Sequence, residues 1–205
     1  MVFTLSKMKK LSLINRILIL FSALLIIPAF FTPLWQINLW APQYPEGLSM
    51  KIWIDRLSGN VDQINGVNHY IGMKYISNEM FPEFTYLVYV VGALVALGVI
   101  AFLIGRRWSL YGFLGLMSLF GIAVLVDMYL WGYDYGHHLD PKAAIKVEGM
   151  SYQPPLIGYK ELLNFLAYSG PDIGSWLLIG GVVLLLAAIV NDRLSNRSQS
   201  PSPYK

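Results

Sequence analysis

Between Phe84 and Gly105 the chain reads FTYLVYVVGALVALGVIAFLIG, which is 22 residues without one charged side chain. A helix that crosses a bilayer needs about 20 apolar residues, so this stretch is long enough. A transmembrane strand would alternate polar and apolar residues, and this stretch does not. Three further charge-free stretches, of 29, 19 and 19 residues, are Ile17–Pro45, Trp108–Val126 and Ile173–Asn191. We therefore expect four transmembrane helices.

The composition of the whole chain supports the same class. Of its 205 residues 56% are hydrophobic and only 13% are charged, whereas a soluble domain carries about 25% charge. The net charge of +3 is too small to indicate nucleic-acid binding. The chain has no cysteine, which excludes disulfides, thiol redox chemistry, iron–sulfur clusters, zinc ribbons and haem attached through cysteine.

The expected fold class is an all-α membrane protein, with four transmembrane helices and a small mixed α/β extracytoplasmic cap formed by two long loops. Leu48–Asp55 alternates strictly and predicts a strand, and Ala143–Glu148 is a candidate partner strand. Apolar residues recur every three or four positions over Val61–Ile76, which predicts a short helix. Tyr159–Tyr168 is amphipathic, which indicates a helix at the membrane interface, and Asp172 is placed to cap the last span.

Basic residues predict the orientation of the spans. Nine of the 15 Lys and Arg residues lie in the N-terminus, the Arg106-Arg107 turn and the C-terminal tail. We therefore expect a protein of the bacterial inner (cytoplasmic) membrane with both termini cytoplasmic and a periplasmic functional face. The predicted segments are a cytoplasmic N-terminus (1–16), spans at 17–35, 84–105, 108–131 and 173–191, extracytoplasmic arms at 36–83 and 132–172, a turn at 106–107, and a disordered cytoplasmic tail at 192–205.

The first span could instead be a cleaved signal peptide, because basic residues precede its apolar core. Its apolar part is long, however, and the segment from Pro28 to Pro33 is a poor cleavage site. We interpret it as a retained anchor.

Histidines and methionines in the arms suggest a metal site. His69 and Met73 are four apart in the predicted short helix and would share one face. His137 and His138 follow the third span, and Met150 lies further along the same arm. Imidazole and thioether ligands suit copper, Cu(I) especially. The alternative is that these side chains pack in the cap or lie in solvent.

Asp127 is the only carboxylate inside a predicted span. An ionisable group in a membrane helix indicates a functional site, and a capping, salt-bridge or packing role is the alternative. No catalytic residue is predicted, since the nucleophile elbow, the HExxH zinc motif and the phosphate-binding loop are all absent. No histidine lies within a predicted span, which argues against a haem held by two histidines. We expect neither haem nor flavin.

Four distinctive segments carry a family resemblance: Ala41–Leu48, Asn68–Met73, Trp131–His137 and Gly149–Lys160. Together they resemble a family of small membrane proteins encoded with nitrous-oxide reductase accessory genes in Bacteroidetes-type bacteria, over roughly residues 35–176. The resemblance implies a part in the biogenesis of, or electron supply to, a copper enzyme outside the inner membrane. His69, Met73, His137 and Met150 fall inside the matching segments.

The leading hypothesis is thus a non-enzymatic assembly factor in denitrification, which holds or hands over copper or docks a reductase or a copper chaperone. Its expected partners are membrane lipid and an extracytoplasmic protein. Two alternatives stay open: a structural subunit of a larger membrane complex, and a quinol or electron-transfer anchor that uses Asp127.

Overall fold

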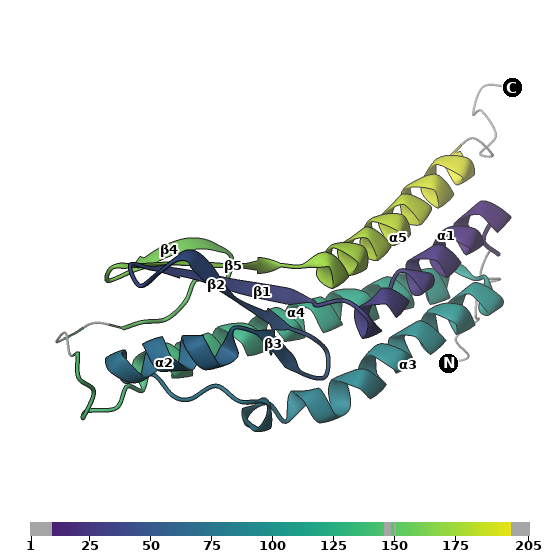
Figure 1. Ribbon diagram of the computed structural model, residues 1–205. Helices are drawn as coiled ribbons and strands as arrows, with labels where there is room; N and C mark the ends of the chain where they lie inside the picture. The colour runs from purple at the N-terminus through teal and green to yellow at the C-terminus, as the bar shows by residue number, and fades with distance from the viewer. Residues whose placement is uncertain (1–9, 146–148, 150, 198–205) are drawn as a thin grey trace, which may run out of the picture. The chain divides into compact units, whose positions relative to one another are not determined.

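The computed structural model describes residues 10–145, 149 and 151–197. The helices are α1 (Leu13–Leu24), α2 (Val61–Ile71), α3 (Glu83–Ile104), α4 (Arg107–His137) and α5 (Ile173–Arg197), with 3₁₀ turns at Ile27–Phe30 and Asn78–Met80. The strands are β1 (Trp35–Ala41), β2 (Tyr44–Ile52), β3 (Leu57–Gly59), β4 (Gly158–Leu162) and β5 (Phe165–Pro171) (Figure 1). The chain is 58% helical and 18% strand. The expected all-α class is therefore wrong, and the fold is mixed α/β.

Among the described residues, four helical segments are long and apolar enough to cross a membrane: Leu13–Phe30, Glu83–Ile104, Arg107–His137 and Ile173–Ser195. α3 illustrates why, since its outward residues Leu97, Ile100 and Leu103 are as apolar as the buried ones. A helix that is apolar on all sides requires lipid or protein around it. The chain is a membrane protein.

The chain divides into two compact units. The helical unit comprises Met1–Pro28, Val90–Phe120 and Leu177–Lys205, and the sheet unit comprises Ala29–Tyr89 and Gly121–Trp176. Each is described separately below.

Close packing in the helical unit depends on small residues. A Cβ atom added at Gly98 of α3 would lie 2.6 Å from both the Ala23 Cβ of α1 and the Phe113 Cζ of α4. α1, α3 and α4 thus approach one another closely at Gly98, because glycine has no side chain. Lipid gives no hydrophobic driving force between helices, so small residues that allow such approach are what membrane bundles use.

One end of the helical unit gathers basic residues from three segments. The backbone N–H of Leu11 donates to the Gly105 carbonyl at 2.8 Å, so the start of the chain lies beside the α3–α4 turn. The Arg16 Nε donates to the Phe102 carbonyl at 3.1 Å. Arg107 pairs with Asp192 near the end of α5, with Nε and Oδ2 2.7 Å apart. The first span, the turn and the last helix therefore meet at this end.

A buried polar contact joins the first and last helices. Asn15 is 1% exposed, and its Oδ1 accepts a hydrogen bond from the Asn191 Nδ2 at 2.8 Å. We expect Asn15→Val to lower stability in detergent by about 1 kcal/mol, because the Asn191 amide is left without its acceptor. Thermal unfolding measures this, with the lipid-facing variant Leu13→Ala as control. Equal losses in both variants would contradict the prediction.

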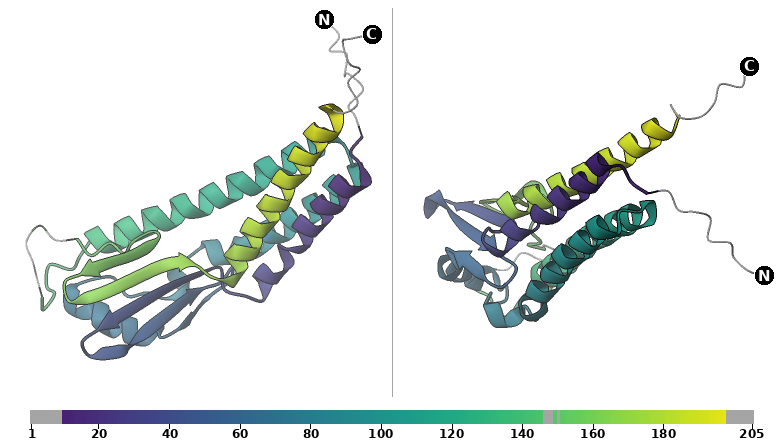
Figure 2. Two further views of the ribbon diagram at one scale, coloured as in Figure 1. Left: turned by 90° about the horizontal axis from the view of Figure 1, so that it is seen from above. Right: turned by 90° about the vertical axis from the view of Figure 1, so that its right-hand side faces the viewer.

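The sheet unit is built from both arms. Its strand order is β3-β2-β1-β5-β4, and every neighbouring pair is antiparallel. β1 is central: Trp35 lies opposite Ile52 of the first arm on one side and Pro171 of the second arm on the other. α2 and the last turns of α4 lie under one face of this sheet (Figures 1 and 2). Their buried side chains and those of the sheet form one core, which includes Met50, Ile64, Val67, Ile71, Tyr135 and Phe165.

The secondary structure predicted for the two arms agrees only in part with the observed elements. The strand predicted over Leu48–Asp55 overlaps β2. α2 starts as predicted at Val61 but ends at Ile71, because Gly72 has a left-handed backbone (φ +77°) that terminates helices. Ala143 to Ile145 form no strand, with bends at Ala144 and Ile145, and residues 146–148 lie outside the described part.

The prediction for the second arm is wrong in its secondary structure. Tyr159–Tyr168 is not an interfacial helix but the hairpin of β4 and β5. Leu163 at the turn has φ +57°, a left-handed conformation that a helix does not allow. Phe165, Ala167 and Ser169 alternate as buried residues along β5. Pairing with β1 supplies the backbone hydrogen bonds that override the helical periodicity.

The ends of the first and last spans also differ in detail. α1 runs from Leu13 to Leu24, and a 3₁₀ turn that contains Pro28 leads into β1. Asp172 directly precedes α5, as expected of its cap, and its Oδ1 accepts from the Ile173 N–H at 2.7 Å. α5 continues to Arg197, so residues 192–197 of the predicted disordered tail are helical, and 198–205 lie outside the described residues.

Candidate functional site

The two metal-ligand candidates of the first arm do not share one face. His69 lies in α2, is exposed, and contacts the ring of Tyr70 edge-on at 6.2 Å. Met73 follows the end of the helix and packs against the core, where it lines a cavity. The helix ends before Met73, so the four-residue spacing does not bring imidazole and thioether together.

The histidines of the second arm are engaged locally. Both are exposed at the end of α4. His137 stacks on Tyr133, with ring centroids 4.0 Å apart, and its Nδ1 lies 2.9 Å from the Tyr133 carbonyl oxygen. The His138 Nδ1 lies 2.7 Å from Asp134 Oδ1, and Asp134 also pairs with Lys74. Met150 lies outside the described residues.

These placements do not form a shared metal centre. Within residues 10–145, 149 and 151–197, no three His, Asp or Glu side chains gather as they would to hold a metal. The contacts of His137 and His138 are those of histidines at a helix end. A copper site built from His69, Met73, His137, His138 and Met150 stays a prediction that the described geometry does not favour.

Asp127 has a more distinctive setting. It lines a cavity of about 90 Å³ in the sheet unit, together with a second carboxylate, Glu83 at the start of α3. The remaining walls are mostly aromatic and aliphatic: Leu34, Trp35, Ile52, Trp53, Phe81, Phe84, Leu87, Val124, Met128, Trp131 and Ser175. Asp127 itself is exposed and Glu83 is half-buried, so the two carboxylates lie at the open side of this cavity.

A second feature lies on the face of the sheet opposite the core. Register places Trp40 opposite Leu166, and Tyr159 opposite Tyr168, so these four residues share one face, which we call the aromatic sheet face. The Trp40 and Tyr159 rings stack at 6.4 Å, and Tyr159 and Tyr168 lie 4.8 Å apart. Tyr159 is 67% exposed.

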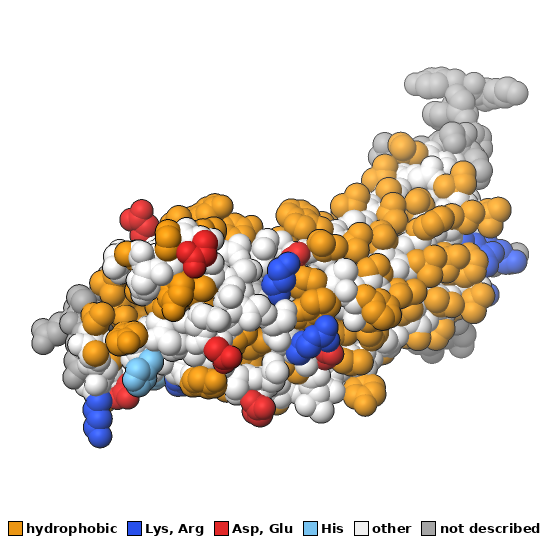
Figure 3. All heavy atoms as spheres, in the orientation of Figure 1, with side chains coloured by type: hydrophobic (Ala, Val, Ile, Leu, Met, Phe, Trp, Pro, Cys, Tyr) orange, Lys and Arg blue, Asp and Glu red, His pale blue; other side chains and the backbone are white. Residues whose placement is uncertain are grey.

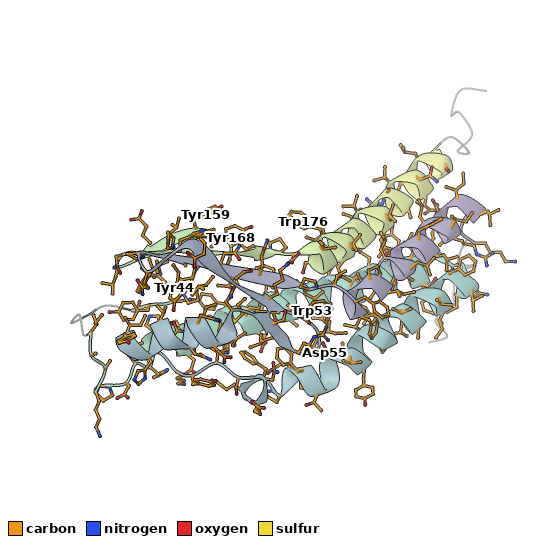
Figure 4. All side chains as sticks on the ribbon, viewed as in Figure 1. Tyr44, Trp53, Asp55, Tyr159, Tyr168 and Trp176 are labelled. Atoms are coloured by element: carbon orange, nitrogen blue, oxygen red, sulfur yellow. The ribbon has the colours of Figure 1, made fainter. Side chains whose placement is uncertain are left out.

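No described helix covers the aromatic sheet face. Figure 4 shows Tyr159 and Tyr168 on the side of the sheet away from α2. Figure 3 shows hydrophobic side chains along this part of the sheet unit, with acidic side chains beside them. Exposed aromatic side chains that support one another in this way are typical of a protein-binding surface.

The sequence alone did not predict the aromatic sheet face. It also did not predict that Glu83 lines the same cavity as Asp127. Tyr159 and Tyr168 were assigned to a helix, where residues nine apart do not meet. The alternating burial of Phe165, Ala167 and Ser169 corresponds to an alternating pattern that could have predicted β5. Glu83 lies 44 positions before Asp127, and only the fold places both side chains around one cavity.

Comparisons of this chain with protein-family models, with curated proteins and with solved structures found no match.

Proposed function

We propose that this membrane protein is a non-enzymatic accessory protein that docks an extracytoplasmic partner through the aromatic sheet face. The observation that carries the proposal is that Trp40, Tyr159, Leu166 and Tyr168 lie together on a sheet face that no described element covers. Trp and Tyr are the residues most enriched among those that dominate binding energy at interfaces. Both arms contribute strands to the sheet beneath them.

The partner class comes from the family resemblance. We infer that the partner is a copper enzyme of the nitrous-oxide reductase kind, or its copper chaperone, and that the chain supports its maturation. Docking fits the geometry better than copper binding, because Met73 packs into the core while His69 is exposed. A structural subunit of a larger complex would use the same face.

The orientation proposed for this role follows from charge. Lys10, Arg16, Arg106 and Arg107 lie at one end of the helical unit. Basic residues are enriched on the cytoplasmic side of membranes. We therefore infer that both termini are cytoplasmic, that the membrane is the bacterial inner membrane, and that the sheet unit is periplasmic.

The test combines Trp40→Ala with Tyr159→Ala. Loss of two aromatic anchors from an interface reduces affinity by at least about tenfold. Binding of the purified full chain to the purified copper-free enzyme measures this. Tyr75→Ala is the matched control, since Tyr75 is 64% exposed and its hydroxyl donates to Asp62 of α2.

In cells, the control variant should restore the copper content of the enzyme in a deletion strain, and the double variant should not. Unchanged affinity of a folded double variant would contradict the proposal. Folding of each variant is checked by its melting temperature.

A further inference from the structure

The core of the sheet unit contains a second cavity, with a volume of about 60 Å³, between the sheet and α2. Its walls include Ala167 of β5 and Ile64 of α2. We propose that this cavity binds an uncharged, largely apolar molecule with one carbonyl oxygen, and that the Tyr152 hydroxyl donates a hydrogen bond to that oxygen. The aromatic sheet face is on the other side of the sheet, so this proposal and the docking proposal succeed or fail independently.

The observation that points to a ligand is an unsatisfied polar atom in the cavity wall. Tyr152 is 1% exposed, and it lines the cavity. Its hydroxyl oxygen is buried and has no hydrogen-bond partner among residues 10–145, 149 and 151–197. A buried hydroxyl that has left water without gaining a partner lowers the stability of the fold. An acceptor within the cavity would remove that cost.

The other polar side chains of the wall do not supply this acceptor. The Asn68 Nδ2 donates to the Tyr135 hydroxyl at 2.6 Å, so these two groups are paired with each other. A buried water makes about three hydrogen bonds. Apart from Tyr152, this pair and the indole of Trp131, the side chains that line the cavity are hydrocarbons or thioethers. The cavity therefore suits a molecule that needs one hydrogen bond better than it suits water.

The wall also defines the rest of the ligand. None of the residues that line the cavity is charged, and an ion is strongly disfavoured in such surroundings, so the ligand is neutral. A carbonyl oxygen accepts from Tyr152 and brings no donor of its own that would need a partner. The space accommodates only a few heavy atoms, which is a carbonyl with short alkyl groups. Met50 and Met73 contribute flexible thioether side chains that adapt to such a shape.

The test titrates the purified full chain, delipidated in detergent, with methyl propyl ketone and separately with n-pentane, which lacks the oxygen. Isotope-labelled methionine methyl groups report binding by NMR. Met50 and Met73 line the cavity, whereas Met117 belongs to the helical unit and is the internal control. We expect saturable shifts at Met50 and Met73 with both probes, and none at Met117.

Tyr152→Phe isolates the hydrogen bond. It should weaken binding of the ketone at least about fivefold and leave binding of n-pentane unchanged, because only the ketone loses a hydrogen bond. Tyr70→Phe is the matched control, since Tyr70 is 58% exposed and does not line the cavity. Ala167→Val should weaken binding of both probes, because its larger side chain occupies the space.

Three results would overturn the proposal. Absence of saturable shifts at Met50 and Met73 would show that the cavity takes neither probe. An equal loss for the two probes in Tyr152→Phe would show that the hydroxyl makes no bond to the carbonyl. A lower melting temperature for ligand-free Tyr152→Phe than for the unaltered chain would show that water already satisfies the hydroxyl.

A measurement on the unaltered chain decides the question should Tyr152→Phe fail to fold. A hydrogen bond moves the NMR shift of a ketone carbonyl carbon downfield from its value in cyclohexane. We expect that displacement for the bound ketone, and the cyclohexane value would overturn the proposal.

Discussion

Replacing Gly136 by alanine is expected to destabilise the sheet unit by about 3 kcal/mol, since no relaxation of a side chain can make room for the new methyl group. A Cβ atom at Gly136 would lie 2.3 Å from both the backbone N and the Cα of Gln153. The chain crosses α4 at this point, and the Tyr152 N–H donates to the Gly136 carbonyl at 2.9 Å. The backbone must therefore shift and weaken that hydrogen bond.

The neighbouring glycine one turn earlier provides the control. A Cβ at Gly132 would lie 3.9 Å from the Pro154 Cγ, which is ordinary contact. Gly132→Ala should therefore be neutral or stabilise the helix by up to about 1 kcal/mol, because alanine loses less backbone entropy. Chemical unfolding of the two variants, followed by tryptophan fluorescence, compares them. Similar stabilities for the two variants would show that the crossing is not as close as described.

Asn65→Ala is expected to have the second large effect, a loss of about 3 to 4 kcal/mol, because two buried backbone groups lose their partners. Asn65 is 5% exposed in α2. Its Nδ2 donates to the Ile76 carbonyl at 2.8 Å, and its Oδ1 accepts from the Ile76 N–H at 2.7 Å. Ile76 is itself 2% exposed, so water does not replace the amide.

The physical role of Asn65 is to fix the segment that follows α2. That segment has no regular secondary structure from Met73 to Ser77, and the Asn65 amide satisfies both backbone polar groups of its buried residue Ile76. Gln63→Ala is the control, because Gln63 is exposed in the same helix. Hydrogen exchange at the Ile76 amide should rise strongly in Asn65→Ala and stay unchanged in the control. Equal exchange rates in the two variants would contradict this role.

The spans could be predicted from local sequence, but their ends could not. The charge-free stretch from Phe84 corresponds to α3, whose first residue is Glu83. Trp35, expected at the end of the first span, instead begins β1. Hydropathy does not distinguish an apolar helix from an uncharged strand that follows it. β1 has no charged residue, and its Ile37 and Leu39 pack against the core of the sheet unit.

The candidate site was predicted only as single residues. The sequence indicated Asp127 because a charged residue within a predicted span is unusual. Glu83, which lines the same cavity, directly precedes another predicted span and gave no such signal. The spacing of His69 and Met73 suggested a common face, but Gly72 ends the helix between them. Spacing is informative only while one regular element continues, and a single left-handed residue removes that condition.

The sequence alone established that this is a membrane protein, because crossing a bilayer requires a continuous apolar stretch and that property is local. Tertiary structure decided that the two arms share one sheet, that Tyr159 and Tyr168 lie on its open face, and that Glu83 and Asp127 line one cavity. The reason is that strand pairing and cavity formation join residues distant in the chain. No local pattern specifies which strand will supply the hydrogen bonds of β1.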